Sequence, residues 1–225
     1  MEVIDRIPVT LEREAIADRL RVSPARAASL GFDALLDQAR SLIALRAVYE
    51  ISYTGAKGDD TVDVAGVTFR SRVLRRNLDQ AQKVFPFIMT AGPALEAAAS
   101  ASGDLLKQYY LEEMANIALG EGAAWLAARL SERWGFPALS SMDPGSLEDW
   151  PITEQPKLFS IFGDTERLVG VRLTDSLLMV PRKSISGILF PSEEGFQSCR
   201  LCEREKCPGR RTPYDAALAD EYRKP

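Results

Sequence analysis

The chain is organised around residues 167–214, which read RLVGVRLTDSLLMVPRKSISGILFPSEEGFQSCRLCEREKCPGRRTPY. Two apolar runs, Leu168 to Leu173 and Ser176 to Val180, come before Pro181. Alternating apolar residues are typical of strands, but runs this short also suit a helix that turns into a strand. The sequence therefore leaves open a pair of strands and a helix-to-strand turn.

A segment with serine and glycine follows Pro181. Ser184, Ser186 and Gly187 provide two hydroxyl groups and a flexible backbone position, which suits hydrogen bonding to a polar ligand. The simpler interpretation is a turn between strands, because loops without a binding role commonly contain the same residues.

The three cysteines of the chain, Cys199, Cys202 and Cys207, have the spacing C-x2-C-x4-C. Clustered thiolates favour soft metals, here zinc or an iron-sulfur cluster. The sequence contains no histidine, so a fourth ligand would be Glu203, Glu205, a bound molecule or a partner's group. A redox-active pair with one spare thiol, and three free cysteines, are the alternatives.

Composition limits the class of protein. The 225 residues are 46% hydrophobic, which is enough for one large domain or two small ones. The net charge of -4 argues against nucleic-acid binding, which relies on a basic face. No apolar run approaches the roughly 20 residues that span a bilayer. The first ten residues include acidic side chains and lack the apolar core of a secretory signal peptide. An odd number of clustered cysteines does not resemble a disulfide framework, so a reducing cytoplasm is the expected compartment.

The periodicity along the chain predicts a mixture of helices and strands. Helical spacing covers Leu11 to Leu20 and Ala25 to Glu50, and a further helix is expected from Asn77 to Lys83. Thr61 to Ser71 alternates on both sides of an Ala-Gly turn, as a hairpin does, and Val84 to Gly92 resembles a buried strand.

Asp104 to Trp134 gives the longest helical pattern, with small and apolar residues over much of its surface. Glu121 lies between two glycines, so another backbone or a ligand could approach it closely. The alternative is an ordinary solvated glutamate. Phe136 to Pro156 is irregular and rich in proline, serine, glycine and aspartate.

Three segments together resemble the activation domain of cobalamin-dependent methionine synthase: the helix around Glu121, residues 140–163 (SSMDPGSLEDWPITEQPKLFSIFG) and residues 167–190. The likeness is greatest to free-standing activation subunits that carry a C-x2-C-x4-C tail, and it covers residues 50–215. The family motifs Leu-Thr-Glu-Ser, Met-x-Pro and Ser-Val-Ser-Gly are matched by Leu173, Thr174, Asp175, Ser176, Met179, Pro181, Ser184, Ser186 and Gly187.

The resemblance implies an α+β fold: a helmet-like single domain with long central helices packed on a twisted, mainly antiparallel sheet. Residues 1–50 would form an N-terminal helical segment. Residues 51–215 would form the activation-like domain, and the cysteine tail would occupy residues 196–215.

The resemblance also implies an accessory role in methionine biosynthesis. Such domains bind S-adenosylmethionine and stand over a corrinoid protein, or over the cobalamin-binding domain of methionine synthase. They support reductive remethylation when cobalt(I) has been oxidised to cobalt(II), and the electron would come from a flavodoxin or ferredoxin-type donor. An iron-sulfur cluster on the cysteines could relay that electron, and the protein would mainly position the methyl group.

The ligand cleft implied by the family match is formed by Glu121, Asp143, Pro144, Gly145, Ser146, Ser184, Ser186 and Gly187. The family's Arg-x-x-Pro-Gly-Tyr motif aligns with residues 141–146, so Ser141 and Ser146 replace its arginine and tyrosine. An arginine there would pair with the ligand carboxylate, and serine carries no charge to do so. Asp143 could attract the ligand's ammonium group. Substitute cations from elsewhere in the chain are Arg133, Arg182, Arg210 and Arg211.

Arg210, Arg211 and Tyr214 are expected to face a partner, with a solvated basic tail as the alternative. The sequence does not identify a catalytic residue. A second functional hypothesis is a non-catalytic corrinoid-protein partner or electron-transfer module that has lost S-adenosylmethionine binding. A third is a component of a methionine-forming methyltransferase.

Overall fold

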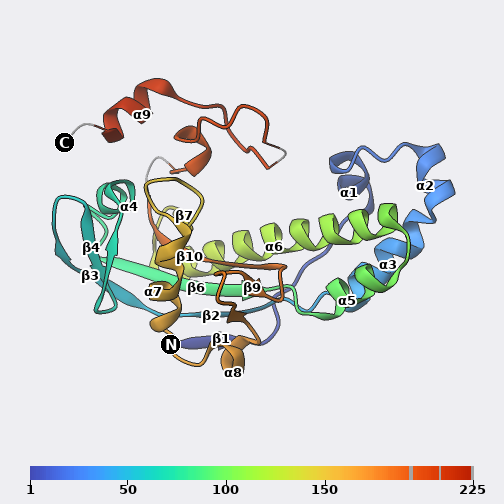
Figure 1. Ribbon diagram of the computed structural model, residues 1–225, viewed down its shortest axis with the longest axis horizontal. Coiled ribbons are helices and arrows are strands. Elements are labelled where there is room, and N and C mark those ends of the chain that lie inside the picture. The colour runs from blue at the N-terminus through green and yellow to red at the C-terminus, as the bar shows by residue number, and fades with distance from the viewer. Residues whose placement is uncertain (193–194, 208, 224–225) are drawn as a thin grey trace.

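The computed structural model describes residues 1–192, 195–207 and 209–223. It has a mixed α+β fold in which one long helix lies along a face of an open antiparallel sheet (Figure 1). This confirms the predicted fold class. The strands are β1 (Glu2–Ile4), β2 (Arg46–Tyr49), β3 (Ser52–Lys57), β4 (Thr61–Val64), β5 (Val67–Arg70), β6 (Lys83–Thr90), β7 (Leu139–Met142), β8 (Arg172–Leu173), β9 (Met179–Val180) and β10 (Ser184–Pro191). The helices are α1 (Arg13–Arg19), α2 (Pro24–Leu30), α3 (Phe32–Leu42), α4 (Arg72–Asn77), α5 (Ala94–Ala101), α6 (Leu105–Trp134), α7 (Gln155–Ser160), α8 (Thr165–Val169) and α9 (Ala216–Arg223).

The sheet is built around β6. One edge of β6 pairs with β2 and then with β3, and the other edge pairs with β10. Strand β1 extends the sheet beyond β2, β7 extends it beyond β10, and β3 leads into the β4–β5 hairpin. Every one of these pairings is antiparallel, so β6 and β10 occupy the buried centre of the sheet.

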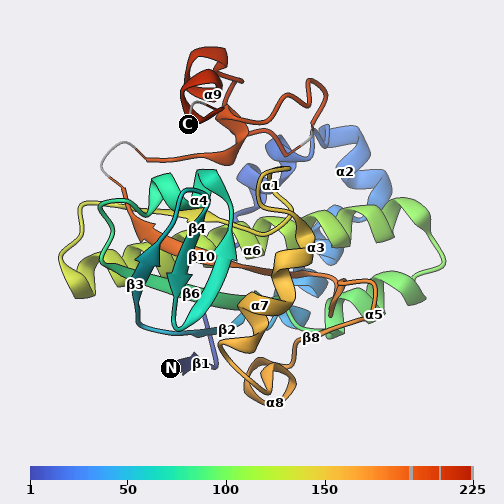
Figure 2. The ribbon, with the colours of Figure 1, turned by 60° about the vertical axis from the view of Figure 1, so that its left-hand side comes forward.

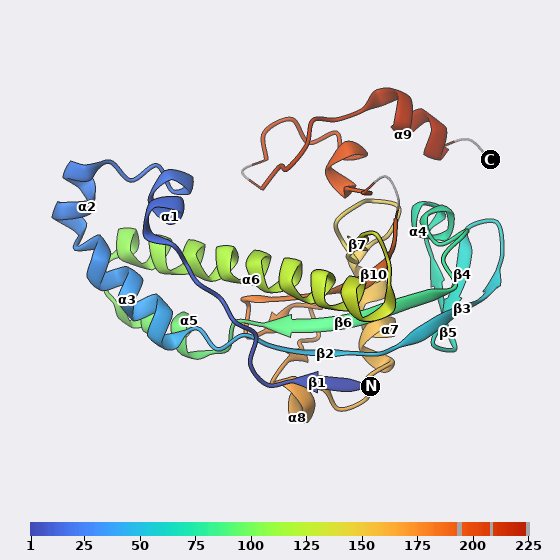
Figure 3. The same ribbon diagram turned by 180° about the vertical axis from the view of Figure 1, so that it is seen from behind.

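Each face of the sheet has its own hydrophobic core. Helix α6 and the N-terminal helices cover one face, while α7 and α8 lie on the other (Figures 1 and 3). A further cluster joins α4 and the β4–β5 hairpin to Trp150, Leu158 and Phe190. The C-terminal segment that ends in α9 lies over this last cluster and contacts it through Phe196 and Tyr222 (Figure 2).

Helix α6 begins and ends at residues suited to those positions. The Asp104 carboxylate accepts hydrogen bonds from Leu106 N at 2.9 Å and Lys107 N at 3.2 Å, and Gly135 ends the helix in the left-handed conformation. Gly122 faces the sheet, where an added Cβ would lie 2.7 Å from Leu45 and 3.0 Å from Met89. The missing side chain therefore lets the helix pack closely on the sheet.

Several elements expected from periodicity are confirmed. The Thr61–Ser71 hairpin turns at Ala65 and Gly66, which have φ angles of 54° and 77°. Strand β6 and helix α6 lie where the sequence places them. The run from Leu168 to Leu173 contains the end of α8 followed by β8, so the helix-to-strand turn is present. Strand β8 pairs with β9, which lies in the run from Ser176 to Val180, so the pair of strands is present as well.

Three expectations about local structure are wrong. The helical pattern of Ala25 to Glu50 is broken at Gly31 and ends at Leu42, because Arg46–Tyr49 forms strand β2 between β1 and β6. The helix expected from Asn77 to Lys83 ends at Asn77 instead. Ser184 to Gly187 belong to the buried strand β10 and do not form a turn. In the described residues, no helix is long and apolar enough to cross a membrane.

Candidate functional site

The Asp143–Ser146 turn comes directly after strand β7. The backbone N–H and the hydroxyl of Ser146 both donate to the Asp143 carbonyl oxygen, at 3.1 and 2.7 Å. Gly145 N donates to Trp150 O at 2.7 Å, and Gly145 has a φ of 85°, which favours glycine. These bonds fix the turn between the sheet and the buried Trp150, so the position of Asp143 is set by backbone contacts.

Gly187 provides the space that the Asp143 side chain occupies. Strand β7 pairs with β10 so that Met142 lies opposite Ile188, which puts Asp143 beside Gly187. A Cβ atom on Gly187 would lie 2.2 Å from Asp143 Oδ1 and 2.5 Å from Met142 O. Any larger residue at position 187 would displace the aspartate. The structure thus brings together two of the residues that the sequence singled out.

The Asp143 carboxylate has a raised pKa. It is half-buried, and burial raises the pKa of Asp143 to about 6, while the positive charge of Arg211 acts in the opposite direction. Within the part of the chain that the structure describes, no hydrogen bond to this carboxylate is present. A desolvated carboxylate without an internal donor is suited to bind a cationic ligand group.

The hydroxyl groups of Ser184 and Ser186 are used inside the fold. Ser184 Oγ lies 2.7 Å from Pro181 O and 2.9 Å from Thr90 Oγ1, and Ser186 Oγ accepts a hydrogen bond from Gln155 Nε2 at 3.2 Å. Both serines are buried. These contacts join β10 to β6 and α7. A role for the two serines in ligand binding stays a prediction.

Glu121 is tied to the N-terminal segment. Its carboxylate accepts a hydrogen bond from Thr10 N at 3.3 Å, and the residue is half-buried on α6. An added Cβ on the preceding Gly120 would meet no atom within 4 Å, so the helix surface beside Glu121 is open. Its membership of a ligand cleft also stays a prediction.

Arg210 organises the cysteine segment. Its guanidinium donates to four carbonyl oxygens: Cys199 O at 3.0 Å, Cys202 O at 2.9 Å, Arg204 O at 2.6 Å and Thr212 O at 3.1 Å. Arg210 is therefore turned towards its own loop, whereas Arg211 is exposed. Tyr214 donates to Glu203 at 3.4 Å. A partner-facing role for Arg210, Arg211 and Tyr214 stays a prediction.

The three cysteines are free and partly exposed. Across residues 1–192, 195–207 and 209–223, no three His, Cys, Asp or Glu side chains are grouped as metal ligands. The thiols are thus near one another in sequence without forming a ligand set in this conformation. A zinc or iron-sulfur site at these cysteines stays a prediction.

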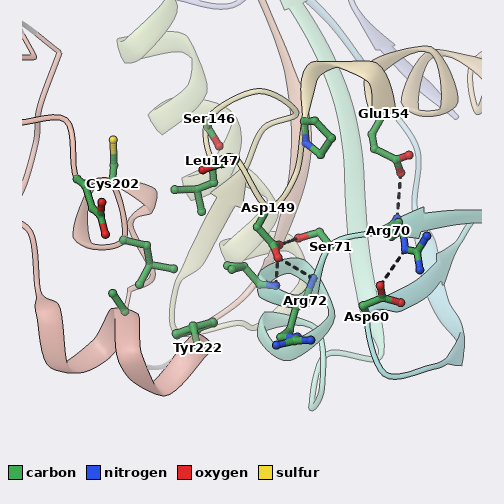
Figure 4. Close-up of a pocket in the computed structure, with 16 residues that line it drawn as sticks. Asp60, Arg70, Ser71, Arg72, Ser146, Leu147, Asp149, Glu154, Cys202 and Tyr222 are labelled. Atoms are coloured by element: carbon green, nitrogen blue, oxygen red, sulfur yellow. Dashed lines mark hydrogen bonds and ion pairs between the residues drawn. The ribbon is translucent and has the colours of Figure 1, made fainter. Parts of the chain in front are cut away.

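A cavity of about 810 Å³ lies between the C-terminal segment and the body of the protein (Figure 4). Cys202 and Tyr222 line it from the C-terminal segment, and Ser146 lines it from the turn after β7. Sequence reasoning missed most of the other lining residues. The central one is Asp149, which accepts hydrogen bonds from the Ser71 hydroxyl, from Val73 N at 2.9 Å and from Arg72 N at 3.3 Å.

The acidic residues of this cavity mostly have partners already. Ser71 is the N-cap of α4, and Asp149 accepts from the Ser71 hydroxyl and from the first two N–H groups of the helix. Glu154 accepts from Arg70 N at 2.9 Å and pairs with Lys157 at 2.7 Å, and Asp60 pairs with Arg70 at 2.8 Å. These carboxylates hold the walls together. Asp143 is therefore the better candidate for a ligand-binding carboxylate.

Comparison with known proteins extends the description of the fold. No protein-family model matches the chain, and no curated protein matches it in sequence. Among solved structures, the chain is similar to the crystal structure of the MetH reactivation domain bound to AdoHcy. The TM-score is 0.57 with 16% identity, and the match covers 84% of this chain and 73% of that one. The chain therefore shares the fold of that reactivation domain.

Proposed function

We propose that this protein binds S-adenosylmethionine and supports the reactivation of a corrinoid-dependent methionine synthase or methyltransferase. Two independent features support the proposal. The fold is similar to that of a reactivation domain whose crystal structure contains AdoHcy. The turn after β7 and strand β10 also carry the residues that resemble the family's motifs.

The observation that carries the proposal is the Asp143 carboxylate. It lies in the turn that matches the family's Pro-Gly motif, and no donor among the described residues bonds to it. Its environment raises its pKa, and a nearby positive charge would favour its ionised form. The α-ammonium group of S-adenosylmethionine is a cation of the required kind.

The chemistry follows from the ligand, and the protein would mainly orient it. The corrinoid would belong to the partner and would accept the methyl group after one-electron reduction by an external donor, with S-adenosylhomocysteine as the leaving product. Holding the sulfonium methyl group in line with cobalt is the contribution that a binding fold can make.

A non-catalytic role is the second candidate, and one observation favours it. Ser141 and Ser146 occupy the positions of the family's arginine and tyrosine, and neither can supply a positive charge. The protein would then act as a docking or electron-transfer partner of a corrinoid protein. A metal on Cys199, Cys202 and Cys207 would suit that role, and the metal content of anaerobically purified protein would reveal it.

Calorimetric titration with S-adenosylmethionine tests the main proposal. We expect the wild-type chain to bind with a Kd in the micromolar range, about -8 kcal/mol. Asp143→Asn should weaken binding by about tenfold or more, because a charge-assisted contact is lost. Asp59→Asn, an equal change on an exposed loop, should leave the affinity unchanged. Wild-type protein that binds neither S-adenosylmethionine nor S-adenosylhomocysteine would contradict the proposal and favour the non-catalytic role.

A further inference from the structure

The cavity between the C-terminal segment and the body of the protein has a volume of about 810 Å³, which suits a small organic ligand. Cys202 and Tyr222 line it from the C-terminal segment, and Arg70 lines it from the body (Figure 4). Ser146 also lines it, and Ser146 is the last residue of the turn that matches the family's Pro-Gly motif. The candidate turn therefore contributes to the wall of this cavity.

Carboxylates outnumber cations on the cavity wall. A cleft whose wall carries an excess of one charge raises the local concentration of ligands of the opposite charge. The cavity is thus suited to a cationic ligand. Among the described residues, five carboxylates and two guanidinium groups line it: Asp60, Glu148, Asp149, Glu154 and Glu203, and Arg70 and Arg72.

Glu148 differs from Asp60, Asp149 and Glu154, which are already held by other elements. Asp149 and Glu154 each accept a backbone N–H at 2.9 Å, and Asp60 pairs with Arg70 at 2.8 Å. Glu148 is exposed, and across residues 1–192, 195–207 and 209–223 it accepts no hydrogen bond and forms no ion pair. Binding a cation through Glu148 would therefore break no bond of the fold.

The cavity wall also has an apolar and aromatic part. Leu147 and Leu201 provide apolar surface, and Tyr222 adds an aromatic ring. That ring is held in place, because its hydroxyl donates to Asn77 Oδ1 at 2.9 Å and its centroid lies 6.0 Å from that of Phe196. A fixed aromatic ring is a good partner for a planar heterocycle. An organic cation that carries a planar base suits both the charge and the apolar surface of this cavity.

We propose that this cavity binds the adenosyl and sulfonium part of S-adenosylmethionine, and that its carboxylates select the sulfonium cation over the neutral thioether of S-adenosylhomocysteine. This inference rests on the proposed function, because it assigns the ligand of the same site. Loss of the methyl group converts the sulfonium to a thioether, so the product would be held less tightly than the substrate. Glu148 and the C-terminal segment thereby gain a role in specificity.

Calorimetry on the full chain with both ligands tests the selection by charge. Wild-type protein should bind S-adenosylmethionine about tenfold more tightly than S-adenosylhomocysteine at low ionic strength, and added salt should reduce this ratio. Glu148→Gln should lower the ratio by about threefold, through weaker binding of S-adenosylmethionine. Glu205→Gln removes an exposed carboxylate that does not line the cavity, and it should leave the ratio unchanged.

Alkylation of the cysteines tests the location of the ligand. Cys202 lines the cavity, whereas Cys199 and Cys207 do not, and all three thiols are free and partly exposed. The rates of modification by iodoacetamide can be followed at each cysteine by peptide mass spectrometry. S-adenosylmethionine at about ten times its Kd should slow the modification of Cys202 about tenfold. It should leave the rates at Cys199 and Cys207 unchanged.

The outcomes separate this inference from the proposed function. If wild-type protein binds S-adenosylmethionine but Cys202 is not protected, the cavity assignment is overturned and the proposed function stands. If both ligands bind equally well, or Glu148→Gln behaves like Glu205→Gln, the selection by charge is overturned. If the wild-type chain binds neither ligand, the proposed function fails and this inference fails with it.

Discussion

At the scale of single residues, Asp143 should make stability depend on pH. Its pKa in the folded protein is about 6, above its ordinary value of 3.8, because burial disfavours the carboxylate. The folded state therefore binds more protons than the unfolded state between these two values, and the free energy of unfolding falls as pH rises through that window. Above it, the ionised aspartate destabilises the fold by about 3 kcal/mol.

Asp143→Asn removes this titration. We expect the variant and wild type to unfold at similar urea concentrations near about pH 4, and the variant to be the more stable near about pH 8. Urea unfolding across this range measures the difference. Asp59→Asn serves again as the control, because that residue lies on an exposed loop. A stability difference that stays constant with pH would show that Asp143 is not desolvated.

The sequence could single out Asp143 and Gly187, but it could not show that they touch. Their contact depends on the register that sets Met142 opposite Ile188, and these strands are far apart in the chain. A long-range register of this kind is set by tertiary packing and leaves no local signal. The effect of the Arg211 charge on the pKa of Asp143 also has no local signal, because the two residues are far apart in the sequence.

At the scale of elements, periodicity predicted the long helix and the hairpin, since both carry strong local patterns. It failed at Ser184 to Gly187, because serine and glycine have low strand propensity and resemble a turn. Burial between β6 and β7 overrides that propensity. It failed at Arg46–Tyr49 because apolar residues continue past the end of α3 without a local break, and only pairing with β1 and β6 makes them a strand.

Helix α4 depends on a residue from another element, which leads to a stability prediction. Asp149 accepts from the Ser71 hydroxyl and from two backbone N–H groups in the first turn of α4. Asp149→Ala should cost about 1 to 2 kcal/mol, because the acceptor of two N–H groups in the first turn and a partly buried bond to Ser71 are lost together. The neighbouring Glu148→Ala changes a residue that is equally exposed and accepts none of these bonds, so it should cost far less. Chemical denaturation of both variants measures the contrast, and equal costs would mean that the Asp149 contacts contribute little.

At the scale of the whole molecule, residues 1–50 share a core with the rest of the chain. Strand β2 lies between β1 and β6, and Leu45, Ala47 and Tyr49 are buried in the cluster beneath α6. Glu2 pairs with Arg133 near the end of α6, which joins the start of the chain to the middle of the sequence. The cost of separating the two parts would be an exposed edge on β6 and an uncovered helix face.

We therefore expect a chain of residues 51–225 not to fold on its own, although the family resemblance begins near residue 50. The full chain should unfold in one cooperative transition, because the cluster beneath α6 draws residues from both sides of that boundary. Thermal unfolding followed by circular dichroism and amide NMR dispersion measures both chains. If residues 51–225 gave a dispersed spectrum and a sharp transition, the N-terminal segment would be an accessory layer. Removal of the N-terminal segment would then leave Asp143 and Gly187 in place, and the truncated chain would still bind S-adenosylmethionine.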